Sequence, residues 1–325
     1  MKIRLTIGFI FILTLPLFSQ PKVNYALVLH GGAGVMQREK MGAGAEQAYL
    51  KVIQQALQTG DSLLAKGVSA LDVVEQVIVI LEDSPLFNAG KGAVLAHDGT
   101  AQLDASLMEG SSLKAGAVCS VTDIKNPIKA ARAVMEHAEH VMLGGVGASE
   151  FARQQGIEMV DNSYFITPER KRSLEQLQQK EREATQNDKH GTVGCVALDR
   201  QGNIVAGTST GGMMNKRYGR IGDSPIIGAG TYASNQTCGV SSTGHGEYYI
   251  RLGFARDISA LMEYRQLTVQ EACQTEIQKL TQLGGTGGVI ALDRHGNISM
   301  EFNTSGMFRG YIKSNGERFA GIFKD

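Results

Sequence analysis

The chain has 325 residues, of which 32 are basic, 32 are acidic and 40 are glycine. Its zero formal net charge excludes a general electrostatic grip on nucleic acid. A hydrophobic fraction of 42% with 20% charged residues excludes a disordered chain and is typical of a packed globular protein. A chain of this length can bury a full core without a metal or a disulfide, so its four cysteines are predicted to be structural thiols.

The first twenty residues are predicted to be a secretory signal peptide. Lys2 and Arg4 precede an apolar run over residues 7–18, and small or polar residues follow it. Twelve residues are too few to cross a bilayer, which takes about 20 in a helix. We therefore expect residues 1–20 to be removed on export to the bacterial periplasm, which leaves a mature protein without a membrane attachment.

The first half of the mature chain reads as strands and helices in alternation. A strand over residues 25–29 opens into His30-Gly31-Gly32-Ala33-Gly34. Apolar spacings of three and four predict the next helices, and Ser69 with Asp72 is typical of a helix N-terminus. In chain order we expect helices 43–66 and 69–81, a loop 83–92, strand segments 93–96, 100–107 and 113–121, and helices 127–138 and 147–156.

Residues 168–190 differ in composition from the rest of the chain. They are dense in Glu, Gln, Lys and Arg and contain only two leucines. Such a segment can bury little apolar surface, so it is predicted to be an exposed linker. A solvated surface helix is the alternative interpretation.

Two segments of the second half repeat each other without gaps. GTVGCVALDRQGNIVAGTSTGGM begins at Gly191, and GTGGVIALDRHGNISMEFNTSGM begins 94 residues later at Gly285. Each reads as a strand, a turn and a second strand. The two copies predict hairpins at equivalent positions in one or two stacked sheets. Helices over 246–264 and 268–283 would cover the outer faces.

Thr192 is the candidate nucleophile. It lies between the charged linker and a predicted strand. If the bond between Gly191 and Thr192 were cut, Thr192 would carry both a hydroxyl and an α-amine with a pKa of about 7.7–8.0. That amine can act as the general base for its own hydroxyl. Thr286 holds the equivalent place in the second copy, but no charged linker precedes it, so it is not expected to be a nucleophile.

Three other reaction classes fit the residues less well. Gly90-Lys91 lacks the remaining residues of a phosphate-binding loop. His137 and His140 share a helix face, but no acidic partner pattern accompanies them. Residues 207–211 match the G-x-S-x-G pattern of serine hydrolases, but no helical pattern follows them as that motif requires.

Further polar residues could serve a reaction at Thr192. Thr210 ends the strand that pairs with the strand after Thr192. Arg220 and Asp223 lie on one glycine-flanked loop, where they suit the α-carboxylate and α-ammonium of an amino acid. A surface salt bridge is the alternative for this pair. Hydroxyl and backbone N–H groups in Thr243-Gly244-His245-Gly246 could stabilise an oxyanion.

Asn88 is a candidate of the same kind. It lies in Phe87-Asn88-Ala89-Gly90, where its amide could orient groups near the nucleophile. A turn-forming asparagine is the alternative interpretation.

Together these motifs resemble the plant-type asparaginases, also called isoaspartyl or β-aspartyl peptidases, which are N-terminal nucleophile hydrolases. The resemblance extends from residue 29 to residue 307. Its most specific parts are Gly191-Thr192-Val193-Gly194, Thr208-Ser209-Thr210-Gly211-Gly212, residues 219–225, residues 228–233 and Thr243-Gly244-His245-Gly246.

The resemblance implies an α+β fold, a four-layer αββα sandwich, and cleavage before Thr192. An α subunit (21–191) and a β subunit (192–325) would form one domain and pair into an (αβ)₂ heterotetramer. The implied catalytic residues are Thr192, Thr210, Thr243 and Gly244. The implied substrate-binding residues are Arg220, Ile221, Gly222, Asp223, Thr243, Gly244, His245, Gly246 and Asn88. No organic cofactor is implied; a structural sodium ion would be held by backbone carbonyls of Leu81, Glu82, Ser84, Phe87, Ala89 and Lys91.

The implied activity is hydrolysis of L-asparagine and of β-aspartyl dipeptides through an aspartyl ester on Thr192. Glycosylasparaginase is the main alternative, since those relatives are often exported. They resemble TSTNG where this chain has Gly211-Gly212, however, and they tend to place a Trp near the pocket, whereas this chain has none. An exported, non-catalytic aspartate-binding protein is a remote alternative, which the retained Thr192, Thr210 and Thr243 disfavour. Ser305 departs from the acidic residue of many relatives.

Overall fold

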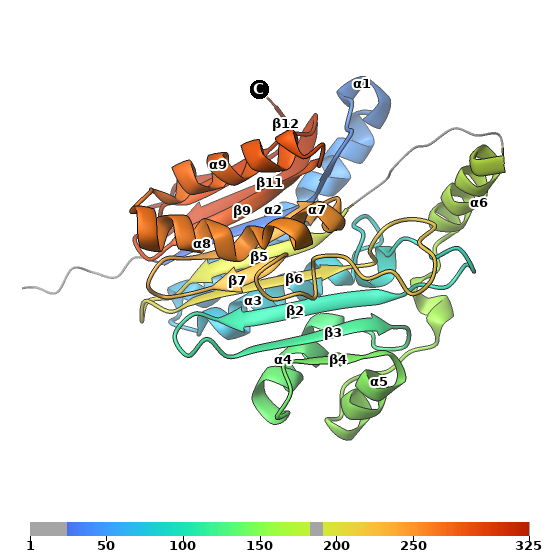
Figure 1. Cartoon of the computed structure of the whole chain (residues 1–325), viewed down its shortest axis with the longest axis horizontal. Coiled ribbons are helices and arrows are strands. Elements are labelled where there is room, and N and C mark those ends of the chain that lie inside the picture. The colour runs from blue at the N-terminus through green and yellow to red at the C-terminus, as the bar shows by residue number, and fades with distance from the viewer. Residues whose placement is uncertain (1–24, 183–190, 325) are drawn as a thin grey trace, which may run out of the picture.

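The computed structural model describes residues 25–182 and 191–324. Two stacked β-sheets lie between two layers of helices (Figure 1). The larger sheet has the order β12-β11-β1-β5-β6-β2-β3-β4, and the smaller has the order β10-β9-β8-β7. This architecture confirms the predicted four-layer αββα sandwich. The predicted signal peptide, 1–20, and residues 183–190 of the predicted linker lie outside the described residues.

The strands come from both halves of the chain. Those of the larger sheet are β1 (Ala26–Gly34), β2 (Leu103–Glu109), β3 (Ala115–Val121), β4 (Met142–Gly144), β5 (Val193–Leu198), β6 (Ile204–Thr210), β11 (Gly306–Lys313) and β12 (Arg318–Phe323). Those of the smaller sheet are β7 (Thr231–Ala233), β8 (Cys238–Gly244), β9 (Gly287–Asp293) and β10 (Ile298–Phe302).

The helices cover the outer faces of the two sheets. On the larger sheet lie α2 (Ala43–Ala65), α3 (Ala70–Glu82) and α4 (Pro127–His137), and on the smaller sheet α7 (Gly246–Leu252), α8 (Phe254–Arg265) and α9 (Val269–Gln282). The other helical elements are α1 (Arg38–Met41), α5 (Gly145–Gln154), α6 (Pro168–Arg182) and the 3₁₀ turns η1 (Gly90–Gly92) and η2 (Asn162–Phe165). Within the described residues, no helix has the length and apolarity to cross a membrane.

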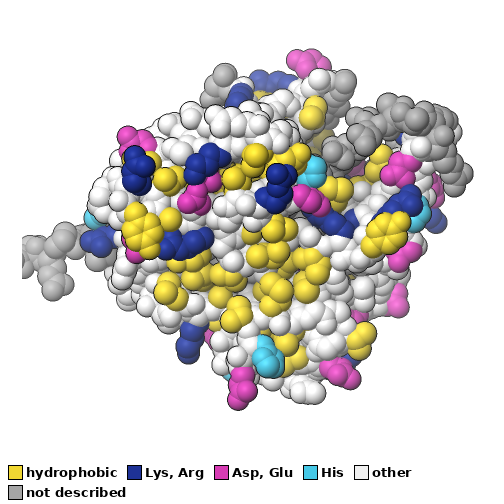
Figure 2. Space-filling model, viewed as in Figure 1, with side chains coloured by type: hydrophobic (Ala, Val, Ile, Leu, Met, Phe, Trp, Pro, Cys, Tyr) yellow, Lys and Arg dark blue, Asp and Glu magenta, His cyan; other side chains and the backbone are white. Residues whose placement is uncertain are grey.

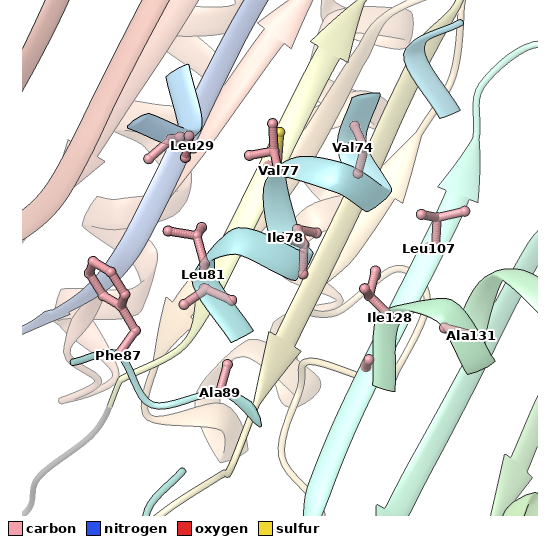
Figure 3. Packing of buried hydrophobic residues seen from close by; sticks show 14 of the residues in the cluster. Leu29, Val74, Val77, Ile78, Leu81, Phe87, Ala89, Leu107, Ile128 and Ala131 are labelled. Atoms are coloured by element: carbon pink, nitrogen blue, oxygen red, sulfur yellow. The ribbon is translucent and has the colours of Figure 1, made fainter. Parts of the chain in front are cut away.

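The core consists of three apolar layers, one for each interface between the four structural layers. Helix α3 buries one face of its apolar residues, and Figure 3 shows Val77, Ile78 and Leu81 directed at the larger sheet. The Ser69 hydroxyl accepts a hydrogen bond from the Asp72 amide at 3.2 Å, as the capping pattern predicted. All four cysteines are buried free thiols.

The repeated segments form one hairpin in each sheet, β5–β6 in the larger and β9–β10 in the smaller. In both turns an aspartate carboxylate accepts hydrogen bonds from two backbone amides. Asp199 accepts hydrogen bonds from the amides of Gln201 (3.0 Å) and Asn203 (2.9 Å), and Asp293 accepts from the two equivalent amides. The prediction of paired hairpins in stacked sheets is confirmed, since each sheet contains one copy of the repeat, and the same side chain closes the turn in both.

Residues 168–182 form helix α6, which is the surface helix given as the alternative to a linker, and Leu174 is buried against the core. Three local predictions were wrong. The helix expected over 246–264 is two helices, since Gly253 adopts φ 59° between them. Residues 93–96 form no strand, only a bridge between Leu95 and Ala101. Strand β1 continues past residue 29 to Gly34, with a bulge at residue 31.

Charges of both signs share the visible surface over α8 and α9 (Figure 2). Arg256 pairs with Glu263 at 3.0 Å, and Lys279 pairs with Asp257 at 2.7 Å. Basic side chains on this face are therefore interleaved with acidic ones.

Candidate active site

Thr192 and Thr210 lie against each other at the open end of the β5–β6 hairpin. Thr192 immediately precedes β5 and Thr210 is the last residue of β6, and the pairing of Val193 with Ser209 brings them opposite one another. Thr192 Oγ1 donates a hydrogen bond to Thr210 Oγ1 at 3.1 Å, and both side chains are buried. The antiparallel register therefore delivers the contact that the hairpin pattern predicted.

The carbonyl of Gly191 faces two hydrogen-bond donors. It accepts from Asn88 Nδ2 at 2.6 Å and from Thr210 Oγ1 at 3.0 Å. Asn88 is held in turn by the Gly212 carbonyl (2.8 Å) and the Val94 amide (2.8 Å). The chain is continuous from Gly191 to Thr192, so this is the geometry before any cleavage. Both donors lie where negative charge would develop on the Gly191 oxygen if that bond were attacked.

The bulge in β1 brings its backbone against the same peptide bond. A Cβ on Gly32 would lie 3.1 Å from Gly191 Cα and 3.2 Å from the Thr192 nitrogen. Gly32 also has φ 109°, which strains any residue with a side chain. The glycine-rich stretch after His30 thus serves close packing against Gly191 and Thr192.

Arg220 and Asp223 converge around the first residue of α7. A Cβ on Gly246 would lie 2.8 Å from Asp223 Oδ1 and 2.9 Å from Arg220 Nη2. Arg220 Nη1 lies 2.8 Å from the equivalent position on Gly222 and 3.6 Å from that on Gly212. The Gly212 amide donates to Thr210 Oγ1 at 2.9 Å. A short series of contacts therefore joins the charged pair to the threonine pair.

Asp223 is a buried carboxyl with an unused acceptor. Desolvation raises its pKa to about 7, and the nearby Arg220 cation opposes that shift. No hydrogen-bond donor among the described residues reaches its Oδ2 atom. A substrate ammonium placed here would supply both the missing donor and the missing charge.

Arg220 already binds one carboxylate that the sequence analysis did not single out. Its Nε and Nη2 atoms each donate to Glu247 at 2.8 Å, and this pairing lowers the pKa of Glu247 to about 2. Nη1 is directed instead toward Gly212 and Gly222. Lys216 is a second buried cation that sequence reasoning missed; it donates to the Gln102 carbonyl at 2.8 Å, and its Nζ lies 2.9 Å from a Cβ position on Gly212.

The expected oxyanion residues end β8. Thr243 is fully buried, and its Oγ1 accepts from the Ala33 amide at 3.4 Å. Gly244 has φ 154°, and a side chain there would overlap the Thr286 carbonyl. The other two predicted pocket residues lie farther out: His245 Nε2 is 3.3 Å from Glu247, and Ile221 is exposed.

A cavity of about 890 Å³ opens beside the Gly191–Thr192 bond. Gly31, Asn88, Gly191 and Gly244 contribute to its inner wall. The remainder is formed by residues 33–37, 86–87, 286–287 and 303–305, together with Val94 and Arg170. Arg220 and Asp223 do not line this cavity.

Thr286, the counterpart of Thr192 in the second repeat, has an exposed side chain. Its carbonyl accepts a hydrogen bond from the His245 amide at 3.0 Å. We expect Thr286→Ala to be cleaved and to turn over substrate like the wild type, because the substitution removes no buried contact. Gel electrophoresis and kcat/KM check this. Loss of cleavage in a folded variant would show that the wrong hairpin had been chosen.

The predicted cation loop lies between α3 and η1. A Cβ on Gly90 would overlap the Glu82 carbonyl, and one on Gly92 would overlap that of Phe87, so a side chain at either position would displace this backbone. The Glu82 side chain turns away and binds Ser209 (2.6 Å), and burial raises its pKa to about 8. In residues 25–182 and 191–324 no group of three or more His, Cys, Asp or Glu side chains could hold a metal.

Comparisons with known proteins agree with this geometry. The asparaginase family profile matches residues 23–322. Isoaspartyl peptidase of Escherichia coli is 46% identical over 92% of this chain and 96% of its own length. Isoaspartyl peptidase/L-asparaginase of Mus musculus is 40% identical (94% and 93% coverage), and plant-type L-asparaginase of Pyrococcus furiosus is 41% identical (89% and 96%). The fold and these matches define an α+β hydrolase. The chain belongs to the asparaginase family, which confirms the resemblance seen in the sequence.

Proposed function

We propose that this protein is an autoprocessing amidohydrolase that converts L-asparagine to L-aspartate and ammonia and cleaves β-aspartyl dipeptides. The observation that carries this proposal is the 3.1 Å contact between the Thr192 and Thr210 hydroxyls beside the Gly191 carbonyl. The names of the relatives support it, since they include both isoaspartyl peptidases and L-asparaginases.

Maturation begins with attack of Thr192 Oγ1 on the carbonyl carbon of Gly191. The oxyanion accepts hydrogen bonds from Asn88 Nδ2 and Thr210 Oγ1, which already bind that oxygen. The Gly191–Thr192 C–N bond breaks, the nitrogen takes the hydroxyl proton, and an ester joins Gly191 to Thr192 Oγ1. Water hydrolyses this ester and leaves a carboxylate on Gly191 and a free α-amine on Thr192.

Turnover uses the amine that maturation releases. The amine takes the proton from Thr192 Oγ1, which attacks the side-chain carbonyl of the substrate. Thr243 and Gly244 stabilise the oxyanion, and Arg220 and Asp223 hold the α-carboxylate and α-ammonium. The amine returns the proton to the leaving ammonia or amino acid. Water then hydrolyses the aspartyl ester and releases L-aspartate.

The cavity beside Gly191 favours substrates with a leaving group larger than ammonia. Its volume of about 890 Å³ greatly exceeds what ammonia needs, and Leu86, Phe87 and Met36 contribute apolar wall. A β-aspartyl dipeptide would place its second residue in this cavity, while Arg220 and Asp223, which do not line it, would hold the aspartyl α-carboxylate and α-ammonium.

The substrate assignment is tested with purified enzyme on L-asparagine, β-aspartyl-leucine and an N-glycosylated asparagine. We expect turnover of the first two, together with two fragments by gel electrophoresis and intact mass. Activity on the glycosylated substrate alone would replace our assignment with glycosylasparaginase. A single chain after prolonged incubation, which binds aspartate without turnover, would instead identify a binding protein.

We also propose export to the periplasm after removal of residues 1–20 and assembly as an (αβ)₂ heterotetramer. The charged start and short apolar run support export, and the family resemblance supports the assembly. A monovalent cation bound by the carbonyls of Leu81, Glu82, Ser84, Phe87, Ala89 and Lys91 would stiffen the loop that carries Asn88. The close approach of carbonyls to Gly90 and Gly92 supports this site, because such cations take oxygen ligands.

The raised pKa of Asp223 predicts a pH dependence in the free enzyme. With a pKa of about 7, the carboxyl ionises between pH 6 and 8, and only the ionised form pairs with a substrate ammonium. We therefore expect kcat/KM to rise with pH through this range. The Asp223 contribution to this rise should be absent from the pH dependence of kcat, because bound substrate keeps the carboxyl charged. Ionisation of the Thr192 amine, by contrast, affects both kcat and kcat/KM. If the rise that is seen in kcat/KM but not in kcat persists in Asp223→Asn, the assignment is contradicted.

The same shift has a consequence for stability. The native carboxyl keeps its proton up to a pKa of about 7, while the unfolded chain loses it near 3.8. Its contribution to the free energy of unfolding is therefore greatest at low pH and falls as pH rises from about 4 to 7. Bound L-aspartate should offset the loss.

A further inference from the structure

His30 is a buried histidine for which the proposed reaction has no use. It lies on β1 between the two sheets, and its Nδ1 atom is 3.1 Å from the carbonyl oxygen of Thr192. Its Nε2 atom is 3.0 Å from Ser241 Oγ on β8. A carbonyl can only accept, so the ring hydrogen lies on Nδ1, and Nε2 accepts from the Ser241 hydroxyl. Burial lowers the pKa of His30 to about 3, which keeps the ring neutral at working pH.

The contact between His30 and Ser241 continues as a chain of buried hydroxyls across the sheets. Ser241 Oγ is 2.7 Å from Thr208 Oγ1 on β6, which is 2.5 Å from Thr231 Oγ1 on β7. Thr231 is 2.8 Å from Ser106 on β2, and Ser106 donates to the carbonyl of Ser224 at 2.6 Å. Ser224 follows Asp223 in the loop over residues 219–225, which carries Arg220 and Asp223 and is called the head-group loop below. We call His30, Ser241, Thr208, Thr231 and Ser106 the hydroxyl chain.

The sequence leaves room for this chain at one glycine. A Cβ on Gly194, two residues after Thr192, would overlap both Ser241 Oγ and His30 Nε2. Because position 194 of β5 is a glycine, His30 and Ser241 can form their hydrogen bond next to the strand that follows Thr192.

The direction of the hydrogen bonds fixes both ends of the chain. The Thr192 and Ser224 carbonyls can only accept, so His30 Nδ1 and Ser106 Oγ must donate outward to them. Ser241 then donates to His30, and Thr208 to Ser241. Thr231 has a single hydrogen for its contacts with Thr208 and Ser106, so one of these two contacts is a close packing contact without a hydrogen bond. Each end is thus held by a donated hydrogen bond whichever way the Thr231 hydroxyl turns.

We propose that His30 is a positioning residue that holds the main chain of Thr192, and that the hydroxyl chain ties this residue to the head-group loop at Ser224. The proposal rests on Thr192 being the nucleophile. Its amine and Oγ1 must keep one alignment during turnover, and both branch from the residue whose carbonyl His30 binds. A displacement of about 1 Å at a reacting group can cost 100-fold in rate.

The test measures kcat and KM for β-aspartyl-leucine on cleaved protein, with active sites counted by burst amplitude. We expect His30→Leu to lower kcat about 10- to 100-fold with KM changed less than about twofold, since alignment rather than substrate binding is lost. His30→Asn should recover much of kcat, because its amide can donate to the Thr192 carbonyl from nearly the place of Nδ1. Wild-type kcat per active site in His30→Leu would overturn the proposal.

A matched control separates positioning from ordinary loss of a buried hydrogen bond. Ser241→Ala breaks the hydroxyl chain, whereas Ser259→Ala breaks the buried Thr237–Ser259 hydroxyl contact of 2.6 Å on the outer side of the smaller sheet. Both should lower thermal stability, and only Ser241→Ala should lower kcat. An equal fall of kcat in the two variants would overturn the positioning role. Ser241→Ala also carries the test if His30→Leu does not fold.

The link to the head-group loop has its own measurement. Ser106→Ala and Ser241→Ala are combined in a double-mutant cycle on kcat/KM. We expect the double variant to lose clearly less than the product of the two single losses, because either substitution breaks the same chain. Multiplicative losses would overturn the link. All of these variants keep Thr192, so failure of this proposal is distinct from failure of the proposed function, which Thr192→Ala tests.

Discussion

Thr192→Ala is expected to remain a single full-length chain with no measurable turnover. The substitution removes the only atom that can attack the Gly191 carbonyl in the proposed maturation, so the α-amine is never released. Both the base and the nucleophile of the later reaction are therefore lost together. Intact-mass analysis after prolonged incubation and an asparagine assay measure the two effects.

Thr192→Ser is the matched variant for this prediction. It keeps a hydroxyl but loses the methyl group that restricts the side-chain rotamer, so we expect slower cleavage and reduced turnover rather than abolition. Normal activity in Thr192→Ala would refute the nucleophile assignment. A cut chain in that variant would show that another residue or a protease performs the cleavage.

Arg220→Ala is expected to reduce kcat/KM by 10- to 100-fold or more. A hydrogen bond to a charged group contributes about 1.5–3 kcal/mol, and Arg220 would offer the substrate carboxylate such a contact. The substitution also leaves Asp223 and Glu247 without their nearby cation, so the pKa of Glu247 should return upward from about 2. Steady-state kinetics on L-asparagine measure the loss.

Arg220→Lys tests whether the planar guanidinium matters beyond its charge. Arg220 donates two parallel hydrogen bonds to Glu247, and a lysine ammonium cannot reproduce that geometry. We expect partial activity with a raised KM. Unchanged kcat/KM in Arg220→Ala would place the carboxylate site elsewhere.

Local sequence patterns predicted the elements whose cause is local. Helix α3 follows from its apolar spacing and its Ser69 cap, and the two hairpins follow from the repeated Asp-Arg-X-Gly-Asn turn. Helix α6 was predicted only as an alternative to a linker, because its position is fixed by distant partners. Leu174 packs into the core, and Arg170 donates to the carbonyls of Gly92 and Leu86 at 2.7 and 3.3 Å. Composition alone cannot reveal such contacts.

The same distinction holds for the candidate site. The contact between Thr192 and Thr210 could be predicted because they lie at opposed ends of one hairpin. Glu247, Lys216 and His30 could not, since their partners come from elements far away in sequence. The run of glycines after His30 was visible, but its physical reason is the approach of Gly32 to Gly191 and Thr192, which only the fold provides.

The interleaved order of the larger sheet has a consequence for how the protein can unfold. Strands β1 to β4 precede Thr192, while β5, β6, β11 and β12 follow it, and β5 is hydrogen-bonded between β1 and β6. Cleavage before β5 would break no ladder hydrogen bond, so the two pieces would stay joined through the middle of a sheet. Once such a molecule is denatured, however, its recovery becomes a second-order reaction between two polypeptides. At high dilution the two polypeptides would meet too rarely to refold, so unfolding would become effectively irreversible.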